Sequence, residues 1–323
     1  MANCWVRRLS LRQRSLLRPD LNKALLNIPR YWLRMGTTTS SEKRHRHGAE
    51  AFVESVERVA GELRRARQRA PHVLSDAYEA AAREHTSSLV AVLKALECED
   101  FSLQRRDLES PEHDREGTPS LHPGQWPEEC NWPVRPIQYV YGAEYPGLFS
   151  VGVFVLPKGA YLPLHDHFGM VVVSRVLWGS LIMRALDFDN PSTSTDYSVL
   201  ESHHQEGGWA RSVLERCERR AGDTWVLYPK SGGNIHEIVA LNEPCAMLDV
   251  IMPPYPAPSI FLDQSSEHEL YQCHYYRAKQ RLQSEIRDSN SRWFLERFLG
   301  DDLVYVQRAR QRFLPGLWRF NHR

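Results

Sequence analysis

The spacing of apolar positions divides the chain into a helical region and a β-rich region. Between Ala49 and Pro71 apolar residues recur every three or four positions, and 89–96 repeats that spacing, so both stretches predict amphipathic helices. Beyond residue 135 the pattern changes to short runs of β-branched and aromatic residues, most of them bounded by Gly or Pro. These runs lie at 148–156, 170–177, 180–186, 223–228, 235–240 and 246–251. Because no helices alternate with them, they predict an antiparallel sandwich or barrel.

Prolines and polar residues mark the expected boundaries. Prolines recur between residues 111 and 136, where neither a regular helix nor a central strand can continue, so a linker is expected there. The interval 189–212, rich in Ser, Thr, Asn, His and Gly, predicts a long surface excursion in which His203 and His204 are exposed to solvent. The chain is thus divided into a basic leader at 1–48, a helical segment at 49–104, a Pro-rich linker at 105–134, a core at 135–278 and a C-terminal helical extension at 279–323.

Composition narrows the classes of protein to consider. The 323 residues carry 41 basic and 40 acidic side chains, so no overall field attracts nucleic acid, and no apolar run is long enough to span a bilayer. The six cysteines are scattered without a CxxC pair, which argues against a disulfide framework and against a cysteine-built zinc site and indicates a reducing compartment. The leader is rich in arginine, which is typical of a mitochondrial transit peptide or of a disordered basic tail. We expect a cytoplasmic protein, with mitochondria as the alternative.

The candidate chemistry lies on histidines. His165 and His167 begin an apolar run, and residues two apart on a strand share a face, so both imidazoles can point into a barrel while Asp166 points away. His236 follows a glycine turn at the start of another expected strand and offers a third ligand. Three imidazoles suit one divalent metal ion, and by ligand type alone iron and zinc are both possible.

Two groups of residues resemble the paired motifs of the cupin β-barrel. They are Gly159, His165, His167 and Gly179, followed by Gly222, Pro229, Gly233 and His236. The usual cupin motif has a glutamate ligand at the position that Val172 occupies here. The resemblance therefore implies a site of three histidines with no acidic ligand.

A narrower resemblance covers about residues 136–277. The segments LPLHDHFGMVVVSRVLWGSL, GNIHEI and CHYYR, in that order, are similar to the thiol dioxygenases that comprise plant cysteine oxidases and cysteamine dioxygenase. Phe168 stands where that family usually has proline, and the 189–212 excursion is unusual for it. The resemblance implies a mainly β protein, with a cupin-type antiparallel double-stranded β-barrel flanked by N-terminal helices. It also implies Fe(II) as the metal held by His165, His167 and His236.

The same resemblance implies two catalytic residues. Asp249 ends an apolar run, where a carboxylate is costly unless it faces a cavity or a partner, and a substrate ammonium is such a partner. The alternative is a barrel-rim aspartate that accepts hydrogen bonds from backbone amides. Tyr255 follows two prolines and either lines the substrate site or packs at the barrel mouth. Cys273 and Tyr275, which can become covalently linked in the animal branch, are read as ordinary core residues.

The implied function is oxidation of N-terminal cysteine in proteins or peptides to sulfinic acid with O₂, which marks the protein for oxygen-dependent N-degron degradation. Two alternatives remain open: a dioxygenase for cysteamine or another small aminothiol, and a cupin that binds metal without turnover. Phe168 and the long excursion favour the last reading if they block the pocket. Neither nucleic acid nor a membrane is expected as a partner, and the protein is expected to be a monomer.

Overall fold

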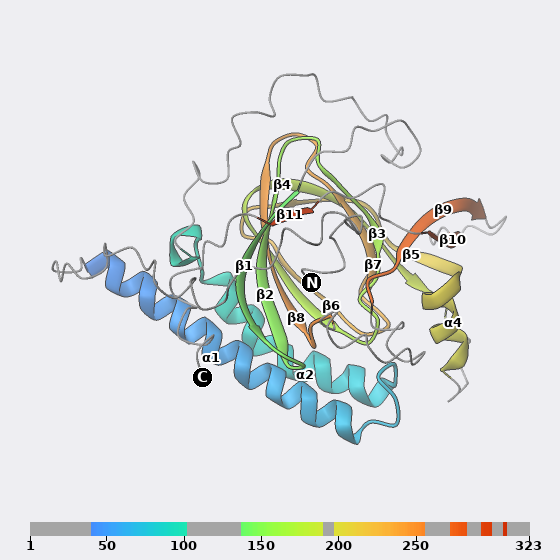
Figure 1. Cartoon of the computed structure of the whole chain (residues 1–323), viewed down its shortest axis with the longest axis horizontal. Helices are drawn as coiled ribbons and strands as arrows, with labels where there is room; N and C mark the ends of the chain where they lie inside the picture. Colours follow the sequence, from blue (N-terminus) through green and yellow to red (C-terminus); the bar gives the residue numbers. More distant parts are fainter. Residues whose placement is uncertain are drawn as a thin grey trace, which may run out of the picture.

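The computed structural model describes residues 40–101, 137–189, 197–255, 272–282, 292–298 and 306–308. Within these ranges the fold is mainly antiparallel β-sheet with helices on its N-terminal side, as the sequence predicts (Figure 1). The helices are α1 (Ser40–Arg69), α2 (Asp76–Lys94), the 3₁₀ turn η4 (Cys98–Phe101) and α4 (Ser198–Glu206). The strands are β1 (Ile137–Tyr145), β2 (Phe149–Leu156), β3 (Tyr161–His165), β4 (Val171–Phe188), β5 (Gly207–Arg220), β6 (Thr224–Leu227), β7 (Ile235–Val239), β8 (Cys245–Met252), β9 (Tyr275–Leu282), β10 (Arg292–Phe298) and β11 (Val306–Arg308).

Helices α1 and α2 cover one face of a sheet built from β1, β2, β8, β6 and the first half of β4 (Figure 1). The apolar stripe of α1, including Phe52, Val56 and Leu63, is buried against α2 and this sheet. Ser75 caps the start of α2 by accepting a hydrogen bond from the Tyr78 amide at 3.2 Å. The helices are therefore a packed layer of the domain.

The leader and the linker were assigned from composition, and the structure tests only part of them. Helix α1 begins at Ser40, so residues 40–48 of the leader predicted at 1–48 are helical instead of disordered. These residues continue, toward the N-terminus, the helix whose later turns pack on the sheet. Residues 1–39 and the predicted linker at 105–134 lie outside the described residues.

Strand β8 separates two apolar cores through its period of two. Ala246, Leu248 and Val250 face the helices, whereas Met247 and Ile251 face a second core that lies between the two sheets. The second sheet contains β7, β3, β9, β10, β5 and the second half of β4. The central core between the sheets, which we call the inner core, holds the candidate site.

Strand β4 belongs to both sheets, because its first half pairs with β8 and its second half with β5 and β7. Gly179 lies between the halves with φ of +75°, and a Cβ placed there would lie 1.9 Å from the Pro244 carbonyl oxygen. A side chain at this position is therefore excluded by both conformation and space. Glycine here lets β4 pass close to the β7–β8 connection as it moves from one sheet to the other.

Where the structure describes it, at 189 and 197–212, the excursion predicted at 189–212 is largely regular structure. It contains α4, and the chain is already in β5 from Gly207 onward. The predicted exposure of both histidines is wrong, since His204 is buried and His203 is half-buried. Helix α4 packs with Leu164, Phe168 and Tyr276 in a third apolar cluster, which we call the outer cluster. The polar composition of this interval did not predict the packing, because α4 buries only two of its described side chains, Leu200 and His204.

The C-terminal extension at 279–323 was expected to be helical, and this is wrong wherever the structure describes it. Residues 279–282 continue β9, 292–298 form β10, and 306–308 form β11. In β10, Trp293 and Leu295 are buried while Arg292 and Phe294 are exposed, which is the alternation of a strand. The region is basic, but the pairing of β10 with both β5 and β9 decides its conformation.

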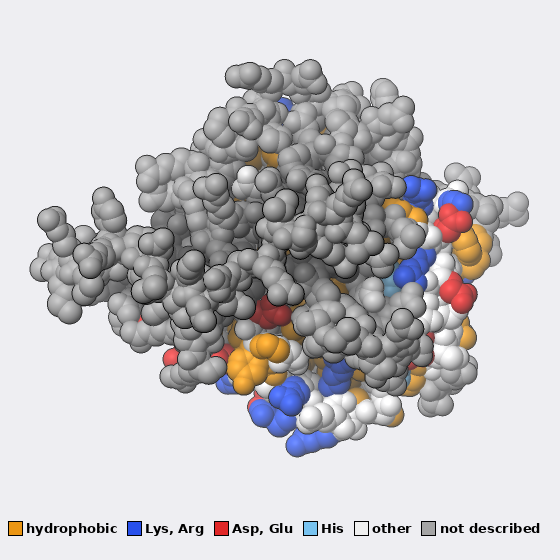
Figure 2. Space-filling model, viewed as in Figure 1, with side chains coloured by type: hydrophobic (Ala, Val, Ile, Leu, Met, Phe, Trp, Pro, Cys, Tyr) orange, Lys and Arg blue, Asp and Glu red, His pale blue; other side chains and the backbone are white. Residues whose placement is uncertain are grey.

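On the face drawn in Figure 2, Lys and Arg side chains gather at the lower edge of the described surface, where the helical layer lies. The last turn of α1 contributes Arg67 and Arg69 to the basic residues of this layer. Among the described residues no helix combines the length and the apolar character that crossing a membrane requires.

Candidate metal centre

Three histidines meet between β3 and β7. His165 ends β3, His236 is the second residue of β7, and the register of these antiparallel strands sets the two directly opposite each other. His167 follows two residues after the end of β3. One ligand atom from each of the three lies within 4.8 Å of the others, and all three residues are buried. The structure thus brings together the histidines that the sequence proposed as a ligand set.

Hydrogen bonds fix the orientation of two of the rings. His165 Nδ1 lies 2.8 Å from the Pro163 carbonyl oxygen, to which it donates, and its Nε2 lone pair therefore remains available. His167 Nδ1 lies 2.6 Å from the Tyr255 hydroxyl, which itself lies 2.6 Å from the Asp166 carbonyl oxygen. The hydroxyl donates to that carbonyl and accepts from the imidazole. His167 thus also presents Nε2, as metal-binding histidines do when their other nitrogen is held.

The third ring, that of His236, lies against the other two. His236 Nδ1 is buried and has no hydrogen-bond partner among the described residues. Its ring centroid lies 4.4 Å from that of His165 and 5.2 Å from that of His167. Burial, and then the neighbouring imidazoles, hold the pKa of His236 well below its usual value, and burial also lowers the pKa of His165 and of His167. Three neutral imidazoles, one with an unsatisfied buried nitrogen, fit a divalent metal ion.

Asn234 connects the two histidine-bearing segments. Its Oδ1 accepts from the His167 amide at 3.2 Å, and its Nδ2 donates to the carbonyl oxygens of His167 at 3.1 Å and Tyr228 at 2.8 Å. The side chain therefore fixes the His167 backbone relative to the turn that leads to His236. Sequence reasoning missed this residue, although its place two positions before a candidate ligand and after two glycines was a usable signal.

Asp187, near the end of β4, shapes the same turn. Its carboxylate accepts from the backbone amides of Gly232, Gly233 and Asn234 at 3.1, 2.9 and 3.0 Å. Gly233 has φ of +84°, and a Cβ there would lie 2.4 Å from the Cβ of Ala185, so only glycine fits. Burial raises the pKa of Asp187 to about 6 despite these hydrogen bonds. This carboxylate was also missed, because nothing in the sequence near β4 indicates a turn about 45 residues away.

Asp249 lies on β8 and faces the inner core. The residues two positions on either side, Met247 and Ile251, belong to that core together with Tyr255. The Asp249 carboxylate accepts a hydrogen bond from Ser174, but its Oδ1 is buried with no hydrogen-bond partner among the described residues. Burial raises the pKa of Asp249 to about 7. A carboxylate with an unsatisfied buried oxygen is suited to bind a cation.

With this geometry in place, comparison with known proteins identifies the family. The family model PCO_ADO matches residues 92–309. The chain belongs to this family. Plant cysteine oxidase 2 of Arabidopsis thaliana is 35% identical over 113 residues, which is 34% of this chain and 37% of that protein. The 2-aminoethanethiol dioxygenase of Mus musculus is 30% identical over 184 residues, which is 52% of this chain and 66% of that protein. The chain thus spans less than two thirds of the length of each of these relatives.

Two solved structures were also found to be similar. One is an RmlC-like cupin protein from Desulfovibrio desulfuricans, which is 16% identical with a TM-score of 0.25 over 37% of this chain and 84% of that chain. The other is a protein with a double-stranded β-helix domain from Klebsiella pneumoniae, also 16% identical with a TM-score of 0.25, over 38% of this chain and 86% of that chain.

The resemblance to thiol dioxygenases is therefore confirmed at the level of the PCO_ADO family. Within this family member, Val172 lies in the inner core where the usual cupin motif carries glutamate, so an apolar side chain takes that place. Cys273 and Tyr275 are both buried in the inner core, and the Cys273 thiol is not in a disulfide. Tyr275 pairs with His165 in the β3–β9 register, with ring centroids 6.3 Å apart.

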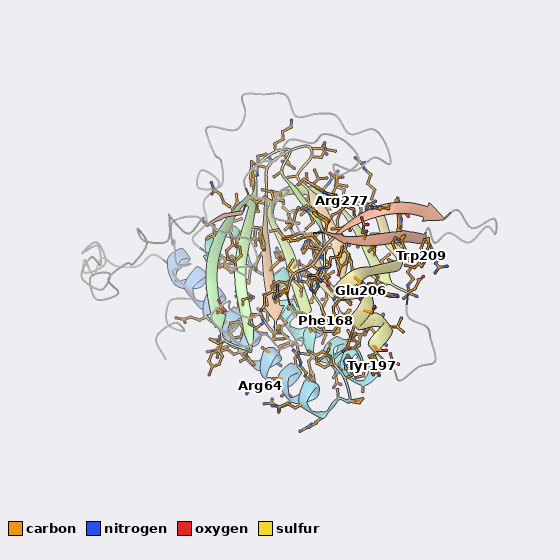
Figure 3. All side chains as sticks on the ribbon, turned by 45° about the vertical axis from the view of Figure 1, so that its right-hand side comes forward. Arg64, Phe168, Tyr197, Glu206, Trp209 and Arg277 are labelled. Carbon is orange, nitrogen blue, oxygen red and sulfur yellow. The ribbon has the colours of Figure 1, made fainter. Side chains whose placement is uncertain are left out.

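Phe168 does not face the candidate site of this PCO_ADO protein. It belongs to the outer cluster, and its ring packs edge-on against His204 of α4 with centroids 4.9 Å apart. Figure 3 shows Phe168 beside α4, which continues through Glu206 toward Trp209 on β5. The proposal that Phe168 blocks the pocket therefore finds no support in its position.

Proposed function

We propose that the protein is a non-haem Fe(II) thiol dioxygenase that oxidises cysteine at the N-terminus of proteins or peptides to cysteine sulfinic acid. The observation that carries this proposal is the buried set of His165, His167 and His236. Within the described residues this set includes no carboxylate or thiolate. Membership of PCO_ADO, whose curated relatives include plant cysteine oxidases and 2-aminoethanethiol dioxygenases, favours iron and a thiol substrate over a zinc hydrolase.

The overall reaction converts R–SH and O₂ into R–SO₂H, so both oxygen atoms end on sulfur and no external reductant is needed. When bound, Fe(II) supplies coordination positions that deprotonate the thiol and bring it next to dioxygen. The protein's part is to hold three imidazoles with their lone pairs converging. Pro163 and Tyr255 do this for His165 and His167 by accepting their Nδ1 protons.

Asp249 is the proposed binding group for the substrate ammonium. An N-terminal cysteine and cysteamine both carry an amine two carbons from the sulfur, so a thiol at the metal places the ammonium close by. The unsatisfied Oδ1 of Asp249 faces the same core as Tyr255, which itself contacts His167. A charge-assisted hydrogen bond there would orient the substrate. Tyr255 lies in the same inner core as Asp249, and its hydroxyl contacts the proposed metal ligand His167.

Cellular context follows from the proposed reaction. Oxidation of an N-terminal cysteine would make turnover of that protein depend on oxygen through an N-degron pathway, and the enzyme would act in the cytoplasm. The arginine-rich leader leaves mitochondria as the alternative. A fluorescent protein fused to residues 1–48 is expected to remain in the cytosol, and its accumulation in mitochondria would replace this assignment.

A second candidate substrate is cysteamine, favoured by the 2-aminoethanethiol dioxygenases among the relatives. The decisive experiment incubates the Fe(II)-loaded protein and O₂ with a peptide that begins with Cys, the same peptide preceded by Met, or cysteamine. We expect the first peptide to gain the mass of two oxygen atoms and the Met-blocked control to remain unchanged. Oxidation of cysteamine alone would assign the small-thiol activity. Absence of O₂ uptake with all three, despite bound iron, would leave a metal-binding cupin.

A further inference from the structure

Asp166 lies between His165 and His167, and its side chain points to the opposite side of the segment. The residue is completely buried. Its Oδ2 accepts from His204 Nδ1 at 2.6 Å and from His274 Nδ1 at 3.1 Å, and its Oδ1 accepts from the His274 amide at 2.9 Å. The Tyr276 hydroxyl lies 2.8 Å from Oδ2. A buried carboxylate with this many donors is fixed in position.

The charge of Asp166 is stabilised by the same neighbours. Burial alone would raise the pKa of this carboxyl, but the charge of His274 and the hydrogen bonds from His204 and His274 hold it well below its usual range. The hydrogen bonds from His204 and His274 thus offset the cost of burying this carboxylate.

His204 comes from α4, which is docked at both ends. Near its start, Glu201 Oε1 lies 2.7 Å from His72 Nε2, and the His72 ring stacks on Tyr197 with centroids 4.5 Å apart. At its end, the carbonyl oxygen of His204 lies 2.6 Å from the Tyr276 hydroxyl, whose single proton is shared between this carbonyl and Asp166 Oδ2, and the carbonyl oxygen of Gln205 accepts from Arg297 at 2.6 Å. Thus the orphan carbonyls of the last turn have partners on β9 and β10.

The His204 ring is enclosed by aromatic residues. Phe168 and Phe188 pack edge-on against it, each with a centroid separation of 4.9 Å. Phe168 is the residue directly after His167, so α4 contacts the ligand-bearing segment both through the Asp166 carboxylate and through this ring. A helix anchored at both ends therefore holds the segment that carries two of the three ligands.

We propose that α4 positions His165 and His167 for metal binding by holding the buried Asp166 carboxylate through His204. This inference rests on the metal site of the proposed function but not on the identity of the thiol. His204 is a positioning residue, since it acts through Asp166 and does not contact the ligands' lone pairs. Removing a residue that hydrogen-bonds directly to a metal ligand typically lowers metal affinity by about 10–100-fold. His204 contacts Asp166 and not a ligand, so a loss of about tenfold is expected for its removal.

The test measures binding of Co(II) to the full chain under anaerobic conditions, with the visible absorption of the bound Co(II) as the report on ligand geometry. His204→Leu should weaken Co(II) binding by about tenfold and change the absorption spectrum. His203→Leu is the matched control, because His203 is the adjacent, half-buried residue of α4 and packs on Phe188. It should leave both readouts as in the wild type. His204→Asn, which keeps a donor near the position of Nδ1, should recover most of the affinity and the spectrum.

Wild-type affinity and spectrum in a folded His204→Leu protein would overturn the proposal while the metal site stands. Failure of the wild type to bind Co(II) and Fe(II) would overturn the metal site, and this inference with it. If circular dichroism shows that His204→Leu does not fold, Tyr276→Phe replaces it, since this change removes one hydroxyl from the same carboxylate. Tyr276→Phe should weaken Co(II) binding in the same direction, and wild-type values for it would overturn the proposal.

Discussion

Two polar clusters lie back to back on the segment 165–167, and they differ in how completely their atoms are satisfied. On one side His165, His167 and His236 converge, and the Nδ1 atom of His236 has no partner among the described residues. On the other side the Asp166 carboxylate is within hydrogen-bond distance of His204, His274 and Tyr276. Buried polar groups in folded proteins are almost always paired. The difference indicates that the first cluster is built for an additional ligand and the second for rigidity.

The largest expected effect comes from breaking the unsatisfied cluster itself. His236→Ala should reduce Fe(II) affinity by more than about 100-fold, since even partners outside the ligand set can account for 10–100-fold. Anaerobic titration with Fe(II) measures this, and His85→Ala on α2 is the control because His85 lies outside the cluster. Retention of iron by His236→Ala would remove His236 from the ligand set.

Asp187 is a second buried carboxylate with several hydrogen-bond donors, and it differs from Asp166 in its pKa. It accepts three backbone hydrogen bonds, yet burial raises its pKa to about 6. Its folded-state pKa is raised, so between pH 4 and pH 6 the folded protein keeps a proton that the unfolded chain releases. The free energy of unfolding should therefore fall by about 3 kcal/mol as the pH rises through this range.

Denaturant unfolding of the metal-free protein at each pH provides the measurement. The Asp187→Asn variant keeps an acceptor for the Gly233 and Asn234 amides but cannot titrate, so it should lack this component of the pH dependence. Identical pH dependence in the two proteins would show that Asp187 is ionised throughout.

A substitution of Asp249, whose Oδ1 has no partner among the described residues, can separate substrate binding from metal binding. Asp249→Asn should lower kcat/KM for a peptide with N-terminal cysteine by about tenfold to a hundredfold, because one charge-assisted hydrogen bond contributes about 1.5–3 kcal/mol. Iron affinity should not change. Ser174→Ala is the matched variant, since it removes the hydrogen bond to Asp249 but leaves the carboxylate, and it should retain most activity. Full activity of Asp249→Asn would give this residue a structural role.

The smallest effect is expected at the residue that joins the two sides. The Tyr255 hydroxyl contacts both His167 Nδ1 and the Asp166 carbonyl oxygen. Tyr255→Phe leaves the imidazole N–H without its acceptor and should weaken Fe(II) binding by about tenfold. Isothermal titration separates this outcome from that of Asp249→Asn, for which affinity for the metal is unchanged. An unchanged affinity in Tyr255→Phe would limit the tyrosine to packing.

The site was predictable where its geometry follows from local sequence. The alternation of side chains predicted His165 and His167 on one side and Asp166 on the other, and the arrangement holds although β3 ends at His165, before the other two residues. The glycine turn before β7 indicates His236. The β-rich core followed from the same local patterns. The satisfied cluster was not predictable, because His204, His274 and Tyr276 lie 38 to 110 positions from Asp166. The strands after residue 278 were missed for a similar reason: β10 is defined by pairing with β5, not by its own composition.

The passage of β4 through both sheets has a consequence for how the protein loses its structure. One continuous strand of 18 residues supplies hydrogen-bond partners to β8 and β6 at one end and to β5 and β7 at the other. Neither sheet can therefore detach without breaking the backbone ladder of the other. The sheets should act as one cooperative unit, and amide hydrogens in the middle of β4 should exchange with solvent only through global unfolding.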